Sequence, residues 1–223
     1  MITDYSKQET LFRPSNYSGR INIVGCGACG SWLAFFLLKM GFKNIHVYDY
    51  DVVEEHNIPN QLFKESNIGS LKVTSLKNIY NEFFLDDDER LTVHPDPITS
   101  TNANRLKGVI FNAVDSMAAR QYIYERAYKY GQAELLIEDR LSVYGGYIYT
   151  LGKDLERHEN EYEKTFYDDE DAEVSACGIS QTALPAAVTT ASIMIMQLIS
   201  WIKKENVHFK VLYTIPDMYS IIS

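Results

Sequence analysis

The sequence has few cysteines and no excess of basic residues. Three cysteines in 223 residues are a small and odd number, so a framework of structural disulfides is not expected. Lysine and arginine number 21 against 30 aspartate and glutamate residues, which gives a net charge of −9. Binding to DNA or RNA needs clustered cations that neutralise phosphates, so we expect no nucleic-acid partner.

A membrane span and a secretion signal are also not expected. We expect no apolar, uncharged stretch to approach the ~18 to 20 residues that a membrane span requires. The first twenty residues, MITDYSKQETLFRPSNYSGR, lack an apolar signal core. A cytoplasmic protein is therefore predicted. The length suits a single domain over 1–223, with an N-terminal arm at 1–19 and an acidic crossover loop at 152–180.

The most informative segment is a glycine-rich loop at 25–30 (GCGACG), which directly follows the apolar run 21–24. A strand that leads through a tight glycine turn into a helix points free backbone N–H groups and the positive helix end at phosphates. Asp49 follows the next apolar run, nineteen residues after Gly30, where a carboxylate can bind ribose hydroxyls. The loop predicts a nucleotide, but alone it fits a dinucleotide as well as ATP.

The same loop contains a Cys-x-x-Cys pair, Cys26 and Cys29. Such a pair can bind zinc, but a tetrahedral site needs a second pair or histidines nearby. The sequence offers neither, so packing of small residues is favoured over metal binding.

Apolar runs alternate with helical segments along the chain. We expect strands at 21–24, 45–48, 91–94, 109–113, 135–138, 143–151 and 207–213, and helices at 31–40, 72–84, 117–130 and 181–204. This order predicts an α/β fold: a Rossmann-like, mostly parallel sheet with helices on both faces and antiparallel C-terminal strands. Ligands of such sheets bind at the carboxyl ends of the strands, so the glycine loop, Asp49 and Asp115 are expected to converge.

An acidic segment precedes the last long helix. Residues 154–173 contain ten acidic and two basic side chains besides His158, and such a charge density predicts a solvated, mobile loop. Cys177 follows, just before the helix at 181–204. A helix N-terminus can lower a thiol pKa and raise its reactivity, although Cys177 is equally compatible with simple packing of a small side chain.

Several short motifs occur in a fixed order. They are Gly25-x-Gly27-x-x-Gly30, Asp49-x-Asp51, Asn57-x-x-Asn60-Gln61, Ile68-Gly69-x-x-Lys72 and Asp115-Ser116. Together they resemble the ubiquitin-activating-enzyme superfamily, whose bacterial branch includes the ThiF and MoeB adenylyltransferases. The resemblance covers about residues 20 to 201. It describes a small, zinc-free member, because the two Cys-x-x-Cys pairs of many bacterial members are missing.

The resemblance implies an ATP-dependent adenylyltransferase with Mg²⁺ as second cofactor. Its substrate would be the C-terminal carboxylate of a ubiquitin-like or sulfur-carrier protein or peptide, with thioester formation at Cys177 as a further step. The family also implies a homodimer. The chemistry is a displacement at phosphorus, in which positioning and charge neutralisation dominate.

Individual roles are carried over from the family to the matching residues. Asp49 would bind the ribose, Lys72 would neutralise phosphate charge, and Asp115 would hold Mg²⁺. The complete nucleotide-binding set implied by the resemblance is Gly25, Gly27, Ala28, Gly30, Asp49, Asp51, Asn57, Asn60, Gln61, Lys72, Asp115 and Ser116.

One position departs from the family pattern. Asn60 stands where the family has arginine, and an asparagine supplies neither a charge nor a bidentate fork for phosphate. Loss of such a cation would cost ~3 to 5 kcal/mol of transition-state stabilisation if nothing replaced it. We expect a substitute: Arg13, because the family uses an N-terminal arginine that reaches across a dimer, or Arg140, which follows a strand near the ligand edge. The candidate catalytic residues are thus Cys177, Asp115, Lys72, Arg13 and Arg140.

Two other functions remain open. An NAD-dependent oxidoreductase would explain the glycine loop and Asp49, but it leaves Gln61, Lys72 and Asp115 without a role. A nucleotide-binding scaffold that has lost catalysis would explain Asn60 and the missing zinc pairs.

Overall fold

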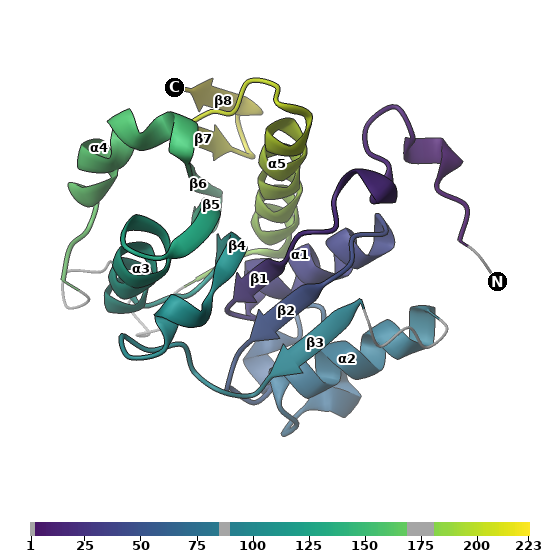
Figure 1. Ribbon diagram of the computed structural model, residues 1–223. Coiled ribbons are helices and arrows are strands. Elements are labelled where there is room, and N and C mark those ends of the chain that lie inside the picture. Colours follow the sequence, from purple (N-terminus) through teal and green to yellow (C-terminus); the bar gives the residue numbers. More distant parts are fainter. Residues whose placement is uncertain (1–2, 85–89, 169–180) are drawn as a thin grey trace.

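The computed structural model describes residues 3–84, 90–168 and 181–223. These residues form a single sheet of eight strands in the order β3-β2-β1-β4-β5-β6-β7-β8 (Figure 1). The strands are β1 (Ile21–Val24), β2 (Ile45–Tyr48), β3 (Leu91–His94), β4 (Lys107–Asn112), β5 (Gln132–Leu141), β6 (Gly145–Gly152), β7 (Lys210–Thr214) and β8 (Tyr219–Ile222).

The predicted fold class is confirmed. Strands β1 to β5 pair in parallel, and β5 to β8 pair antiparallel. All four residues of β1 are buried, as expected of a parallel strand that is covered on both faces. The final strand, β8, was not predicted, because its four residues are all exposed and form no core-facing alternation.

Helices cover both faces of the sheet (Figure 1). One face carries α1 (Ala28–Lys39), α2 (Lys72–Phe83) and α5 (Leu184–Lys203); the other carries α3 (Met117–Ile123) and α4 (Glu159–Glu163). A π-helical segment, Tyr124–Lys129, continues α3, so the helix expected at 117–130 forms in two parts. Each face has its own cluster of buried apolar side chains.

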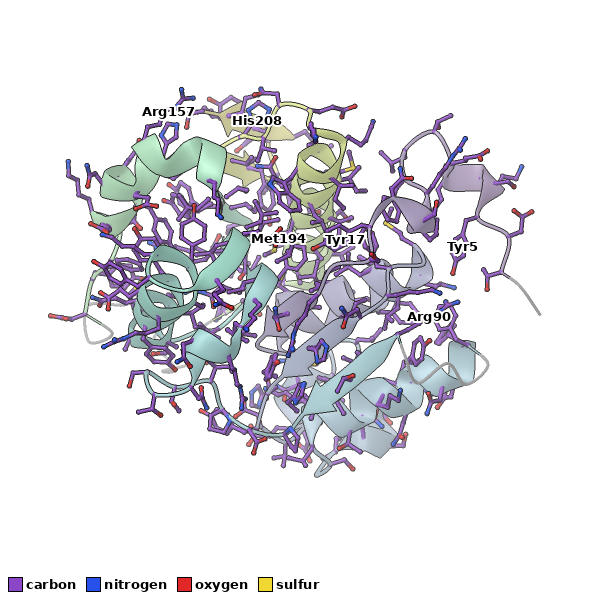
Figure 2. All side chains as sticks on the ribbon, in the orientation of Figure 1. Tyr5, Tyr17, Arg90, Arg157, Met194 and His208 are labelled. Carbon is purple, nitrogen blue, oxygen red and sulfur yellow. The ribbon has the colours of Figure 1, made fainter. Side chains whose placement is uncertain are left out.

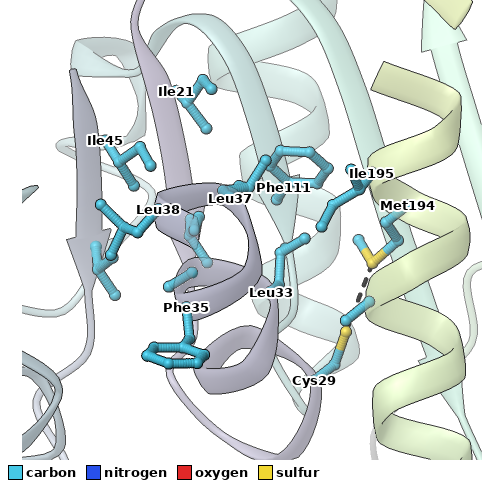
Figure 3. Packing of buried hydrophobic residues seen from close by; sticks show 14 of the residues in the cluster. Ile21, Cys29, Leu33, Phe35, Leu37, Leu38, Ile45, Phe111, Met194 and Ile195 are labelled. Atoms are coloured by element: carbon cyan, nitrogen blue, oxygen red, sulfur yellow. Dashed lines mark hydrogen bonds between the residues drawn. The ribbon is translucent and has the colours of Figure 1, made fainter. Parts of the chain in front are cut away.

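The first turns of α1 lie directly against α5 (Figure 3). Cys29 and Leu33 of α1 face Met194 and Ile195 of α5, and the Cys29 Sγ lies 3.6 Å from the Met194 Sδ. All four side chains are almost completely buried. This packing places the start of α1 between the sheet and α5.

The N-terminal arm packs at the amino ends of the strands. Phe12 stacks on Phe42, just before β2, with ring centroids 4.1 Å apart. Arg90, just before β3, donates a hydrogen bond of 3.2 Å to the Tyr5 hydroxyl (Figure 2). The arm therefore lies at the edge of the sheet opposite the glycine loop.

The expectation that no apolar run is long enough for a membrane span was wrong for Leu184–Lys203. By length and composition this helix passes as a candidate span, with a mean hydropathy of 1.5. Half of that window is buried inside the protein, where α5 packs on α1 and on the sheet. Core helices of globular domains have the same composition when little of their surface faces water.

The predicted mobile acidic loop is also wrong over its first part. Residues Lys153–His158 form a 3₁₀ helix and Glu159–Glu163 form α4. Tyr162 is fully buried and packs edge-on against Tyr124 and Tyr149. The expectation was based on the charge of the segment and did not consider that Tyr162 could be buried. Residues 169–173 lie outside the described residues.

Candidate functional site

The glycine loop packs tightly on its inner side and is open on its outer side. Gly25 has a φ of 94°, and a Cβ there would lie 2.3 Å from the Ala113 carbonyl oxygen. A Cβ on Gly30 would lie 2.0 Å from the Gly25 carbonyl oxygen. A Cβ on Gly27, by contrast, would meet no atom of residues 3–84, 90–168 or 181–223 within 4 Å, apart from its own neighbours in the chain. The loop is thus fixed against the end of β4, and its free side leaves room for a ligand.

The helix that follows the loop has an uncapped N-terminus. Gly27 is the N-cap of α1 and contributes no side-chain hydrogen bond. The first helical hydrogen bond runs from the Ser31 N–H to the Gly27 carbonyl at 3.1 Å, so the amides of residues 28–30 have no partner within the described part of the chain. Free amides and the positive end of the helix dipole suit a phosphate group.

Asp49, which directly follows β2, holds the glycine loop in place. Its Oδ2 accepts a hydrogen bond of 2.6 Å from the Cys26 N–H, and its Oδ1 accepts one of 2.8 Å from the Asp51 N–H. Burial raises the pKa of Asp49 above its ordinary value, and these two amides together with the charge of Lys72 partly offset the effect. Sequence reasoning had assigned Asp49 only to the ribose; the structure shows that it also shapes the loop.

Lys72 joins the second and fourth motifs. Its Nζ lies 2.8 Å from the Asp51 Oδ2, and its N–H donates to the Asp51 carbonyl at 2.9 Å. Burial alone would lower the pKa of Lys72, but the hydrogen bond to Asp51 and the charges of Asp49 and Asp51 outweigh it and raise the pKa. The lysine is therefore a charged group beside the glycine loop.

The third motif is built into the structure by its polar side chains. The Asn57 Oδ1 accepts the Glu54 N–H at 2.9 Å. The Asn60 Nδ2 donates to both the carbonyl and the hydroxyl oxygen of Thr182, at 3.1 and 2.5 Å. Because these bonds use the amide donors, Asn60 does not offer them to a phosphate. The Asn60 Oδ1 and Gln61 Oε1 are buried without a partner among the described residues.

Asp115 lies in the loop that follows β4. It is exposed and forms no ion pair with any described residue. Ser116 caps α3, because its Oγ accepts the Ala119 N–H at 3.3 Å. The Ala113 backbone lies against Gly25, so this loop begins beside the glycine loop. The convergence of the Asp115 side chain with the first motif stays a prediction.

Both candidate substitute arginines are bound to groups of the protein within the single chain. Arg13 is 61% exposed and pairs with Glu9 at 2.9 Å on the N-terminal arm. Arg140 donates its Nε to Glu138 at 3.0 Å and both terminal nitrogens to Thr165 at 2.7 Å. Each guanidinium group is therefore already engaged by acceptors of the protein, and their role as substitutes stays a prediction. Cys177 lies outside the described residues.

The two loop cysteines are free and buried. Burial raises the pKa of both thiols well above the ordinary value, and nearby Asp49 and Asp139 add to the effect for Cys26 and Cys29 respectively. Burial therefore disfavours the thiolate form of both cysteines.

Sequence reasoning missed a buried carboxylate on the opposite face. Glu138 on β5 has no exposed surface and pairs with Arg120 and Arg140. The signal was present in the sequence: Glu138-Asp139-Arg140 is a charged triplet directly after the apolar run 135–137.

Comparison with known proteins identifies the family. Residues 8–221 match the model of the ThiF family. The chain belongs to the ThiF family. This confirms the resemblance inferred from the ordered motifs.

Curated relatives are longer proteins. The adenylyltransferase and sulfurtransferase MOCS3 of Anopheles gambiae is 32% identical over 131 residues, which are 55% of this chain and 29% of that protein. The SUMO-activating enzyme subunit uba-2 of Caenorhabditis elegans is 28% identical over 109 residues, 47% of this chain and 18% of that protein. The chain thus matches less than a third of the length of these relatives.

Solved structures of the family share the fold at low identity. MccB of E. coli, with AMPCPP and MccA, has a TM-score of 0.72 at 14% identity and covers 98% of this chain and 67% of its own. The E. coli tRNA N6-threonylcarbamoyladenosine dehydratase TcdA, in complex with AMP, has a TM-score of 0.64 at 19% identity and covers 89% and 90%. These similarities establish the architecture.

Proposed function

We propose that this ThiF-family chain catalyses ATP-dependent adenylyl transfer to a carboxylate, at the C-terminus of a ubiquitin-like or sulfur-carrier protein or of a peptide. The observation that carries the proposal is the uncapped start of α1 beside a charged lysine. Free amides at 28–30 and the Lys72 ammonium provide the donors and the positive charge that a polyphosphate needs. The proposal includes a cytoplasmic homodimer.

The residues present fit ATP and Mg²⁺. The open side of Gly27 admits phosphate close to the backbone. Among the described residues, no group of three or more His, Cys, Asp or Glu side chains is arranged to hold a metal ion. A single exposed carboxylate, Asp115, suits Mg²⁺, which keeps several waters and takes its other ligands from phosphate oxygens. When bound, Mg²⁺ would neutralise charge on the phosphates.

The chain's own groups orient the reaction. The amides at 28–30 and Lys72 would bind phosphate oxygens, and Asp49 would keep the glycine loop in the conformation that presents those amides. The substrate carboxylate attacks the α-phosphorus, and the bond to pyrophosphate breaks with the charge leaving on the pyrophosphate. Positioning and charge neutralisation supply the rate enhancement.

Labelled ATP tests the proposal. With ATP labelled at the α-phosphate and a carrier protein or peptide, we expect label in an acyl-adenylate and exchange of pyrophosphate into ATP. Asp115→Ala should abolish both, whereas Asp217→Ala, an exposed aspartate in the β7–β8 turn, should leave them unchanged. Label incorporation that is insensitive to Asp115→Ala would refute the assignment. Cys177→Ala then separates adenylation from thioester formation.

One observation favours a non-catalytic alternative. Asn60 supplies no charge, its amide donors bind Thr182, and Arg13 and Arg140 are bound elsewhere. A scaffold would bind ATP without exchanging pyrophosphate for any carrier tested. Calorimetry with ATP and NAD separates both from an oxidoreductase, which would prefer NAD.

A further inference from the structure

Glu138 is the centre of a buried hydrogen-bonded cluster that spans four elements. Its Oε1 accepts from the Arg140 Nε at 3.0 Å and lies 3.4 Å from the Arg120 Nη1. Its Oε2 accepts from the Asn112 Nδ2 at 2.9 Å and from the Tyr162 hydroxyl at 2.6 Å. The donors come from β5, α3, β4 and α4. Three hydrogen bonds and one ion pair therefore surround this carboxylate.

Two of these donors hold the loop that carries Asp115. Asn112 is the last residue of β4, and its amide is fixed by Glu138. Arg120 donates from its Nη2 to the backbone carbonyl of Val114, the residue before Asp115. The short connection from β4 to α3 is thus held at its start by Asn112, which is hydrogen-bonded to Glu138, and next to its carboxylate by Arg120. Arg120 forms an ion pair with Glu138 and also donates to the Asp139 carbonyl.

The other two donors connect the same carboxylate to the segment 159–166. Tyr162 of α4 reaches Glu138 through its hydroxyl. Arg140, held by Glu138, donates to the carbonyl and hydroxyl oxygens of Thr165, and the Thr165 hydroxyl donates to the Tyr162 carbonyl at 2.6 Å. The first part of the crossover therefore depends on Glu138 for its position.

Stability alone does not account for this arrangement. A buried carboxylate with two guanidinium groups carries a large desolvation cost, and well-packed apolar residues often stabilise a fold as well or better. What the charged cluster provides is direction, because each hydrogen bond fixes a distance and an angle. The atoms whose positions it fixes are those of the Asp115 loop and of α4.

We propose that Glu138 is a positioning residue for Asp115: it holds Arg120 on the Val114 carbonyl and couples the α4 segment to the carboxylate that would bind Mg²⁺. Only the last step of this inference, the effect on Mg²⁺ binding at Asp115, rests on the proposed function. The first step, the effect of Glu138 on the loop, concerns the free protein only.

The test compares two tyrosines with the same chemistry on opposite faces. Tyr162→Phe removes one buried hydroxyl from the Glu138 cluster. Tyr213→Phe removes a buried hydroxyl that donates to the Ala186 carbonyl at 2.9 Å and bonds with Thr190, away from the Asp115 loop. Glu138→Gln is the third variant, since it keeps the shape of the side chain and removes its charge.

Hydrogen exchange of the free protein is the first readout. We expect Tyr162→Phe and Glu138→Gln to speed amide exchange in residues 113–117 by about tenfold, the effect of losing ~1.4 kcal/mol of local protection. Tyr213→Phe should leave these amides unchanged. If Glu138→Gln does not fold, Tyr162→Phe carries the comparison. Equal exchange in the Tyr162 and Tyr213 variants would overturn the positioning role.

Calorimetry of ATP binding at varied Mg²⁺ is the second readout. We expect Tyr162→Phe to weaken the apparent Mg²⁺ affinity by about tenfold, a usual effect of changing a residue that orients a metal ligand. Binding of ATP without Mg²⁺ should not change. An unaltered Mg²⁺ dependence would overturn the coupling to Asp115. If the wild-type protein binds no ATP, the proposed function fails, and the exchange experiment still decides whether Glu138 holds the loop.

Discussion

The two faces of the sheet are stabilised by different chemistry. Between the sheet and α1 and α5 the contacts are mostly apolar, with Leu33 and Phe111 completely buried. Between the sheet and α3 and α4, the buried carboxylate of Glu138 contacts two arginines and a tyrosine hydroxyl. Apolar contacts are non-directional, whereas charged hydrogen bonds fix geometry. The first face holds the fold together, and the second sets where the loops at its edge lie.

Removal of the buried carboxylate should have the largest effect on stability and tests the difference between the two faces most directly. Glu138→Ala leaves Arg120 and Arg140 without their acid partner, so the free energy of unfolding should fall by about 3 to 5 kcal/mol. Urea denaturation followed by circular dichroism measures it. A loss below about 1 kcal/mol would show that water or another acid replaces Glu138.

A substitution on the apolar face should lower the free energy of unfolding without changing the geometry of the Asp115 loop. Leu33→Ala removes a fully buried side chain between α1 and α5, and a cavity of this kind costs about 3 kcal/mol. Urea denaturation gives the loss, and hydrogen exchange at 113–117 should match that of the wild type under conditions where both are folded. Faster local exchange there would mean that the two faces are not separate in function.

A titrating group on the apolar face sharpens the comparison further. Burial raises the pKa of Asp139, next to Cys29, from an ordinary 3.8 to about 6. The folded state therefore holds this proton more tightly than the unfolded state, so the contribution to stability is complete below pH ~4 and is lost as the pH rises to ~6.

Asp139→Asn removes this dependence, because the amide does not titrate. The stability of the variant relative to wild type should increase by up to about 3 kcal/mol between pH 4 and pH 7. Paired urea titrations at the two pH values measure the difference. A difference independent of pH would place the titration elsewhere.

The smallest effect is expected at the N-terminal arm. Arg13 and Glu9 form an exposed pair, with side chains 61% and 52% accessible, and exposed pairs contribute less than about 1 kcal/mol. Arg13→Gln should thus leave thermal unfolding within error of wild type. A large loss of pyrophosphate exchange in this otherwise stable variant would show that Arg13 acts on the site of a second subunit.

The sequence was sufficient for the fold and for the motifs that meet at the carboxyl edge. Alternating apolar runs located β1 to β7, and the order of the motifs placed Asp49 and Asp115 just after β2 and β4 and Lys72 at the start of α2. These signals are local, so they can be read along the chain.

Contacts between distant segments could not be read in this way. The bond from Asn60 to Thr182 spans 122 positions, and it gives Asn60 a structural contact that the motif does not indicate. The Tyr162 hydroxyl donates to Glu138, 24 positions away in the sequence. Tyr162 lies in the acidic segment that was expected to be solvated because of its charge. In both cases a long-range partner determined the conformation, and a local pattern carries no information about such partners.

The unfilled space beside Gly27 has one more consequence. No atom of the described residues, apart from the adjacent backbone, lies within 4 Å of a Cβ built there, so a methyl group at this position would be a steric probe that affects ligands while it leaves the described packing unchanged. Gly27→Ala would therefore hinder a ligand from approaching the loop without changing any charged side chain.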